Sequence, residues 1–308
     1  MANFKERILS NVFIKRLTHF FGWKTSYFPK GHFHSVVPSK EQQSSSLRFD
    51  YADINMDFDA QFLTLQKIAK HYSKIPFKKE KQEGLQYYFQ NKFFSFSDGV
   101  ILWCLISEYK PKLIIEIGSG FSTACMLDTI KANQLSSKLI SIDPSQHRSE
   151  KLIPTIENSF YEQINKRVSD LDMLIFNSLK ENDILFIDTS HTSKKGSEIH
   201  YLLFKVFPIL ESGVIIHFHD VFRHFEYPQP WTDEGIYWNE QYLLRAFLQN
   251  NDDYEVLVFS DELEHRYESW YKGNMPLCLN PHEKYTIGSK RGEWISEIRG
   301  QSLWLRKK

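Results

Sequence analysis

The sequence is poor in the features that mark several specialised classes of protein. It has three cysteines in 308 residues, and its 38 basic residues are balanced by 38 acidic ones. Three widely spaced cysteines indicate neither a disulfide framework nor a zinc knuckle, so a reducing cytoplasm is the expected location. The zero net charge creates no field that would recruit nucleic acid, and we expect no nucleic-acid partner.

The N-terminal segment lacks the long uninterrupted hydrophobic run of a signal peptide or a membrane span. Between residues 4 and 20, hydrophobic side chains recur at helical spacing, and basic residues interrupt them. The pattern predicts an amphipathic helix. Such a helix packs on its own domain or on a partner subunit, which includes a second copy of the chain, or makes weak contact with a membrane surface.

The residues that are abundant indicate a globular protein with a large core. Hydrophobic residues make up 42% of the chain and charged residues 25%, while the aromatic share of 15% is high. Aromatic rings on this scale favour either a large core or a pocket walled by rings. Residues 30–50 are polar and rich in serine. We therefore predict a helical extension and connector over 1–83 and a main domain over 84–308.

Strands and helices are predicted to alternate along most of the main domain. Helices are expected at 58–71, at 98–109, where Asp98 is a candidate cap, and at 121–130, 148–158, 171–178, 194–210 and 240–248. Strands are expected at 113–117, 138–143, 163–169, 183–188, 214–219, 254–259 and 302–306. This order predicts an α/β fold: a doubly wound, mostly parallel, seven-stranded Rossmann-like sheet. Residues 260–300 lose the pattern and are expected to form an insertion or lid before the last strand.

The most informative motif is LIIEIGSGFST, residues 113–123. A buried strand passes into a helix through Gly118 and Gly120, which allow a sharp turn and a close ligand, and Ser122 is a candidate cap. The third glycine of a dinucleotide fingerprint is replaced by Thr123. Glu116 places a carboxylate beside the ligand, which disfavours a pyrophosphate and favours a cation.

Acidic side chains follow further strands, at the edge where ligands of doubly wound sheets bind. Asp143 lies 23 residues after Gly120, where it can accept hydrogen bonds from both hydroxyls of a ribose. Asp188, His219 and Asp220 follow two later strands. The ligand is therefore expected to contain a nucleoside, and S-adenosylmethionine, with its ammonium and sulfonium groups, suits the acidic turn.

The motifs together resemble a known family. EIGSGFST followed by SIDP is similar to the first two motifs of class I S-adenosylmethionine-dependent methyltransferases. DILFIDTSH and GVIIHFHDVF resemble the fourth and fifth strands of a bacterial methyltransferase-domain family often associated with glycan and natural-product modification. The resemblance covers roughly residues 84–248. It implies a set of cofactor-binding positions: Glu116, Gly118, Ser119 and Gly120 for the methionine part, Ser122 for its carboxylate, Asp143 for the ribose and Asp170 for the adenine.

Methyl transfer to oxygen needs a group that removes the acceptor proton, or a metal. His219, His191 and Asp188 are the candidate catalytic residues, because they follow neighbouring strands and histidine suits proton transfer near neutral pH. The resemblance also implies a divalent metal site at Asp188, His219 and Asp220. If the strand continued, His219 and Asp220 would face opposite ways.

The acceptor is expected to be a small molecule or a glycan. Tyr87, Tyr88, Asn91 and Phe94, the segment Glu226–Trp231 and the insertion are the candidate walls of its pocket. The main hypothesis is O-methylation of a glycan, glycolipid or small natural product. A dinucleotide-dependent oxidoreductase on a similar sheet, and a partner subunit that binds the cofactor without turnover, remain alternatives.

Overall fold

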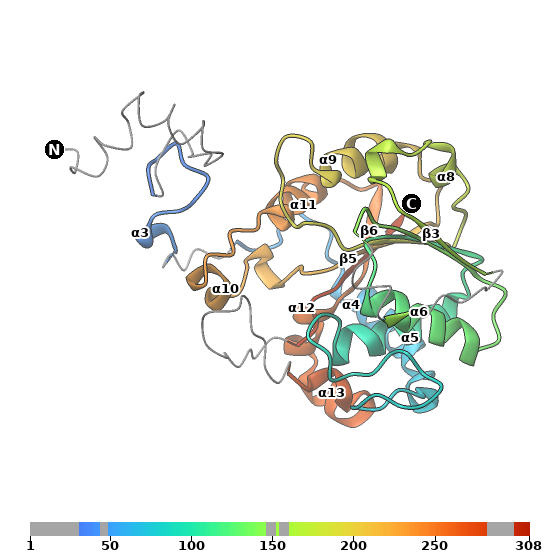
Figure 1. Cartoon of the computed structure of the whole chain (residues 1–308). Helices are drawn as coiled ribbons and strands as arrows, with labels where there is room; N and C mark the ends of the chain where they lie inside the picture. Colours follow the sequence, from blue (N-terminus) through green and yellow to red (C-terminus); the bar gives the residue numbers. More distant parts are fainter. Residues whose placement is uncertain (1–30, 44–48, 146–151, 154–159, 282–298) are drawn as a thin grey trace. The chain divides into compact units, whose positions relative to one another are not determined.

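Hydrophobic runs that end at polar turn residues form the strands of a seven-stranded sheet in the computed structural model (Figure 1). The structure describes residues 31–43, 49–145, 152–153, 160–281 and 299–308. The amphipathic helix predicted between residues 4 and 20 and most of the helix predicted at 148–158 lie outside these residues. The strands are β1 (Leu113–Ile117), β2 (Lys138–Ile142), β3 (Tyr161–Ile164), β4 (Ile184–Ile187), β5 (Ile215–Phe218), β6 (Tyr254–Phe259) and β7 (Leu303–Lys307).

The sheet order confirms the predicted doubly wound fold. The strands run in the order β3-β2-β1-β4-β5-β7-β6, and β1 to β5 pair in parallel. β7 alone runs in the opposite direction, so it pairs antiparallel with both β5 and β6. The carboxyl ends of the parallel strands therefore meet at one edge, where ligands of such sheets bind.

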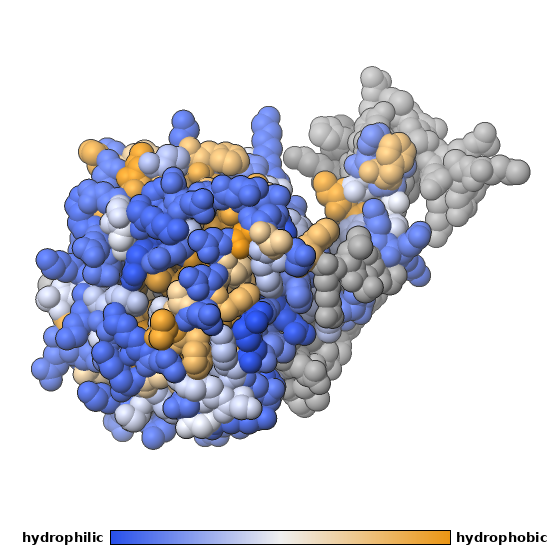
Figure 2. Space-filling model, turned by 180° about the vertical axis from the view of Figure 1, so that it is seen from behind, coloured by the Kyte–Doolittle hydropathy of each residue, from blue (hydrophilic) through white to orange (hydrophobic). Residues whose placement is uncertain are grey.

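Two hydrophobic layers cover the faces of this sheet. On one face, Figure 1 shows α4 (Phe58–Ala69), α5 (Phe96–Tyr109) and α6 (Phe121–Ala132). On the other face lie α8 (Leu174–Asn177), α9 (Glu198–Tyr201) and α11 (Glu240–Leu248). Side chains of β1 alternate between the layers, since Ile114 joins the first and Ile115 the second. The surface in Figure 2 is mostly hydrophilic, with smaller hydrophobic areas between polar residues.

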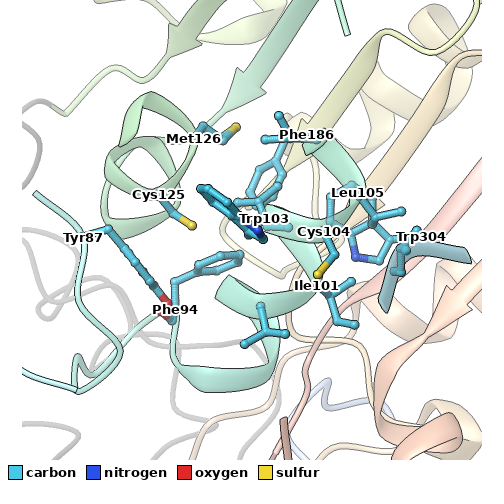
Figure 3. Packing of buried hydrophobic residues seen from close by; sticks show 14 of the residues in the cluster. Tyr87, Phe94, Ile101, Trp103, Cys104, Leu105, Cys125, Met126, Phe186 and Trp304 are labelled. Carbon is cyan, nitrogen blue, oxygen red and sulfur yellow. Dashed lines mark hydrogen bonds between the residues drawn. The ribbon is translucent and has the colours of Figure 1, made fainter. Parts of the chain in front are cut away.

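The first layer contains much of the aromatic excess noted in the composition. Figure 3 shows Tyr87, Phe94, Trp103, Phe186 and Trp304 packed together, and each is at most 2% exposed. The Phe186 ring lies 5.8 Å from the Phe94 ring and 6.1 Å from the Trp304 ring, both edge to face. Of the two explanations for the aromatic share, these residues fit the large core.

The chain divides into two compact units. The smaller unit comprises residues 1–48 and 229–237, and its described part includes α3 (Lys40–Gln43) and α10 (Gln229–Asp233). The larger unit comprises residues 49–228 and 238–308. Residues 49–83, predicted as part of an N-terminal extension, therefore belong to the larger unit, because Leu65 and Ile68 of α4 enter its core.

Two helical regions differ in kind from the predicted secondary structure. The start of the insertion is helical, with α12 (Ser260–Arg266), α13 (Glu268–Asn274) and a 3₁₀ turn η6 (Pro276–Leu279). The helix predicted at 194–210 is α9 followed by a π-helical turn η3 (Leu202–Val206) and a 3₁₀ turn η4 (Phe207–Ile209). Pro208 lacks an N–H and crowds the preceding turn, so a regular helix cannot continue through it.

Among the residues that the structure describes, none of the helices combines the length and the hydrophobicity needed to span a bilayer.

Candidate active site

The glycine turn follows β1 and leads into α6. Gly118 has a φ of 107°, and a Cβ atom at this position would lie 2.5 Å from the carbonyl oxygen of Asp188. Both the backbone conformation and the contact therefore require glycine. The amide of Asp188 in turn donates to the carbonyl of Ile117 over 2.9 Å. The turn after β1 and the residue after β4 are thus in direct contact.

Glu116 supports this turn from inside the protein. Its side chain is fully buried, and its carboxylate accepts hydrogen bonds from Ser122 at 2.6 Å, Thr123 at 2.7 Å and Ser141 at 2.5 Å. Helix α6 is capped at Gly120 rather than at Ser122, whose hydroxyl is turned to Glu116. The carboxylate predicted to face the ligand thus fixes the start of α6 instead.

The pH dependence of stability should report on Glu116. Burial, only partly offset by the three hydroxyls, raises the pKa of Glu116 from 4.5 to about 7. Because the folded pKa is the higher one, the stabilising contribution is fully present below about pH 4.5 and is lost as pH rises through about 7. We expect the unfolding free energy of the wild type, relative to Glu116→Gln, to fall by about 3 kcal/mol between these pH values. Urea denaturation of both proteins across the range checks this, and a constant difference would contradict it.

Asp143 lies directly after β2, beside the glycine turn. One carboxylate oxygen accepts from the hydroxyl of Ser119 at 3.1 Å and the other from the amide of Ser145 at 2.7 Å. Asp143 is partly exposed, so its carboxylate is accessible to a ligand. Asp170 is exposed in a 3₁₀ turn, η2 (Val168–Asp170), which follows β3. The structure therefore brings Ser119 and Asp143 together and records no contact between them and Asp170.

A cluster of carboxylates and histidines lies after β4 and β5. His191 Nε2 lies 3.3 Å from an oxygen of Asp188 and 3.1 Å from an oxygen of Asp220. These three residues form a group whose donor atoms all lie within 4.8 Å of one another, so they could hold a metal ion. The side chain of Asp188 is 33% exposed, whereas those of His191 and Asp220 are buried. The group is thus open on one side.

His219 lies outside this donor group, although the sequence predicted it as a metal ligand. Its Nδ1 is 3.7 Å from Asp188 and 3.6 Å from Asp220, while its Nε2 faces Asp98 at 3.7 Å. The strand ends at Phe218, and Asp220 has a φ of 56°. This left-handed backbone turns Asp220 toward His219, so the two residues do not face opposite ways. His191, with a φ of 54°, is similarly constrained.

Comparison with known proteins agrees with this arrangement. Residues 115–221 match the model of a family described as a methyltransferase domain. The chain contains a methyltransferase domain. The match runs from the middle of β1 through β5, and hence includes the glycine turn, Asp143 and the cluster of Asp188, His191 and Asp220. The predicted family and the predicted enzyme class are confirmed, which disfavours the oxidoreductase and the subunit without turnover.

The chain is similar to several known proteins at low sequence identity. An uncharacterised protein of Archaeoglobus fulgidus is 28% identical over 173 residues, which cover 51% of this chain and 76% of that protein. The solved methyltransferase PaMTH1 of Podospora anserina, bound to S-adenosylhomocysteine, is 13% identical with a TM-score of 0.40, covering 90% and 100% of the two chains. The O-methyltransferase TomG of Streptomyces achromogenes, in complex with S-adenosylmethionine, is 13% identical with a TM-score of 0.36, covering 88% and 100%.

Neighbouring charges strongly shift the pKa values of two histidines in the methyltransferase domain. Burial alone would lower the pKa of His191, but the carboxylates of Asp220, Asp188 and Glu240 raise it to about 10. Burial opposes the same shift at His219, whose pKa is raised well above its usual value by Asp220, Asp188 and Asp98. Both histidines are therefore cationic near neutral pH in the metal-free protein. Neither can accept an acceptor's proton in that state, contrary to the expectation that histidine here is poised as a neutral base.

Three residues of the site were not predicted from the sequence. Glu240 contacts His191 Nδ1 at 3.0 Å, Asp98 faces His219, and the ring of Trp238 lies 4.3 Å from the ring of His191. Asp98 and Glu240 each lie in the first turn of a helix. Their only sequence signal was a carboxylate near a helix start, which usually indicates a cap.

Several of the predicted pocket walls belong to the protein interior instead. The amide of Tyr87 donates to Asp128 at 2.8 Å, and its hydroxyl donates to the carbonyl of Phe94 at 2.8 Å. Asn91 is 8% exposed and donates to the carbonyls of Tyr88 and Phe94. The bond to Asp128 fixes the segment onto α6, and the other bonds hold the segment to itself. The segment Glu226–Trp231 is divided between the two compact units, and residues 282–298 of the insertion lie outside the described residues.

Proposed function

We propose that this chain is an S-adenosylmethionine-dependent O-methyltransferase that acts on a hydroxyl of a glycan, glycolipid or small natural product. One observation carries the proposal: the acidic cluster after β4 and β5 is in direct contact with the glycine turn after β1. Gly118 abuts the carbonyl of Asp188, and the carboxylate of Asp188 belongs to the donor group with His191 and Asp220. A methyl donor in the turn and an acceptor at the cluster would then be neighbours, as an in-line displacement requires.

The residues of the turn fit the cofactor. Gly118 holds the turn against the carbonyl of Asp188, and Asp143 presents a partly exposed carboxylate beside Ser119. The backbone of residues 118–120 would hold the methionine part, and Asp143 would accept hydrogen bonds from the ribose. Glu116 acts indirectly, by fixing Ser122 and Thr123 beneath the turn. When bound, S-adenosylmethionine supplies a methyl group that is already activated for transfer.

The residues of the cluster fit a divalent metal ion. Two carboxylates and one imidazole nitrogen provide a mixed oxygen and nitrogen donor set, and Asp188 leaves the group open on one side. Such a set suits Mn²⁺ at least as well as Mg²⁺, which prefers oxygen ligands alone. When bound, the metal would lower the pKa of a coordinated hydroxyl. Binding would displace the Nε2 proton of His191, so the ion would replace one positive charge that the surrounding carboxylates already stabilise.

The chain's own residues would orient the acceptor. The carboxylate of Asp188 is the exposed polar group of the cluster and can accept a hydrogen bond from the acceptor hydroxyl. The half-buried ring of Trp238, packed against His191, offers a flat surface for a sugar or phenolic ring next to that hydroxyl. Buried His191 and Asp220 exclude water from the inner side of the cluster.

Binding of S-adenosylhomocysteine tests the proposal. Calorimetry should show binding to the wild type, and Asp143→Ala should weaken it about 10- to 100-fold because hydrogen bonds from ribose to a charged group are lost. Asp252→Ala, which removes an exposed carboxylate from the loop between α11 and β6, is the matched control and should bind like the wild type.

Methyl transfer from a labelled donor to a panel of sugars and phenols then identifies the acceptor class. If the wild type did not bind S-adenosylhomocysteine, and Asp143→Ala changed nothing, the proposal would be abandoned.

A further inference from the structure

Both ring nitrogens of His191 contact carboxylates, but from opposite sides. Nε2 faces Asp188 and Asp220, the donor group of the cluster. Nδ1 lies 3.0 Å from an oxygen of Glu240, whose side chain is 3% exposed. Glu240 is therefore on the rear of the imidazole, away from the open side of the cluster, and touches neither Asp188 nor Asp220 in any recorded contact.

Helix α11 holds residue 191 by main chain and side chain together. The amides of Asn239 and Glu240 donate to the carbonyl of His191 at 3.1 and 3.2 Å. The second carboxylate oxygen of Glu240 accepts from the hydroxyl of Thr189 at 2.9 Å. These contacts fix a residue whose backbone is in the left-handed region, with a φ of 54°. Glu240 also lies beyond residues 115–221, the part that matches the methyltransferase domain.

We propose that Glu240 is a positioning residue for the active site. It keeps a proton on Nδ1 of His191, so that Nε2 is the nitrogen that faces Asp188 and Asp220 and becomes free to bind a divalent cation when one enters. A carboxylate behind a ligating imidazole fixes the orientation of the ring and strengthens the nitrogen as a ligand. This inference rests on the proposed function, because it assigns the cluster a cation.

A purely structural role would have different consequences. If Glu240 only anchored α11, its replacement would lower stability and leave the affinity of the cluster for a cation unchanged in the folded protein. Glu198 provides the comparison, since its carboxylate accepts from the amide of Ser190 in the same loop and has no recorded contact with His191. Glu198→Gln therefore perturbs the loop without touching the imidazole.

The first measurement is the affinity of the full chain for Mn²⁺, determined by titration with detection by electron paramagnetic resonance. We expect Glu240→Gln and Glu240→Ala to weaken Mn²⁺ binding about 10- to 100-fold, and Glu198→Gln to change it less than about twofold. All three variants should bind S-adenosylhomocysteine like the wild type, which shows that they are folded. Wild-type Mn²⁺ affinity in both Glu240 variants would overturn the proposal.

The second measurement needs no metal. In protein labelled with ¹⁵N-histidine, and with the His191 signals identified by their absence in His191→Asn, Glu240→Ala should shift the two ring nitrogens and Glu198→Gln should not. If the wild type binds S-adenosylhomocysteine but not Mn²⁺, the cation of the proposed function is refuted. In that case the chemical shifts of the ring nitrogens still test whether Glu240 positions His191. Unchanged chemical shifts in Glu240→Ala would overturn that role.

Discussion

Replacing Gly118 with alanine is expected to abolish binding of S-adenosylhomocysteine and to lower the free energy of unfolding by about 3 kcal/mol. Two costs combine. A φ of 107° is unfavourable for a residue with a Cβ atom, by about 1–2 kcal/mol. The new Cβ atom would also lie 2.5 Å from the backbone carbonyl of Asp188, and overpacking of this kind typically adds about 1–3 kcal/mol. Relief of the clash would move the glycine turn away from β4.

Gly84 provides the matched control for this prediction. It also has a positive φ, 82°, but an added Cβ atom would meet nothing within 4 Å. Gly84→Ala should therefore lower the free energy of unfolding only by the cost of the positive φ, and it should bind S-adenosylhomocysteine normally. Urea denaturation and calorimetry measure both quantities. Equal destabilisation by the two substitutions would show that the contact with Asp188 is not tight, and normal binding by Gly118→Ala would remove the turn from the cofactor site.

Replacing Asp188 with asparagine is expected to abolish Mn²⁺ binding and to slow methyl transfer at least about 100-fold. Although burial would raise it, the imidazoles of His191 and His219 hold the pKa of Asp188 well below its usual range. The carboxylate is therefore ionised at any working pH. Asparagine keeps the shape and removes the charge, so the cluster loses one anionic donor while the backbone contact with Gly118 remains.

The pattern across two assays makes this prediction specific. Asp188→Asn should change the affinity for S-adenosylhomocysteine less than about threefold, whereas Asp143→Ala should weaken it strongly. Initial rates with an acceptor that the wild type methylates, together with Mn²⁺ titration, provide the measurement. Full activity in Asp188→Asn would show that the carboxylate neither binds a cation nor orients the acceptor, and would leave only its main chain in the site.

The fold was largely predictable because its strands are marked by local sequence signals. Hydrophobic runs bounded by polar turns identified β1 and β6 with their observed ends, and α11 was identified by its apolar spacing. β3 was placed too late, since an edge strand of intermediate burial has a weak hydrophobic pattern. The helices α12 and α13 are short. They were not predicted because aromatic and turn-forming residues obscure the helical spacing of their hydrophobic residues.

The site was predictable only where its residues follow strands. Asp143, Asp188, His191, His219 and Asp220 lie near strand ends, and topology alone brings such positions to one edge of a sheet. Glu240 approaches His191 from a helix start 49 residues away, which no local pattern can indicate. Tyr87 was predicted as a pocket wall, because aromatic composition suits a pocket wall and a core equally well. The structure buries it in the core, where its hydroxyl donates to the carbonyl of Phe94.

The antiparallel strand β7 has a consequence for how the chain can fold during synthesis. β6 joins the sheet only through β7, which pairs with β5 on its other side. The ribosome makes β6 first, so this edge strand must wait without a partner until residues 303–307 have emerged. Strands β1 to β5 can pair earlier, because each strand from β2 to β5 pairs with a strand that precedes it in the sequence. Unpaired strand edges favour aggregation in nascent chains, and α4 and α12, which contact β6, provide the nearest cover during that interval.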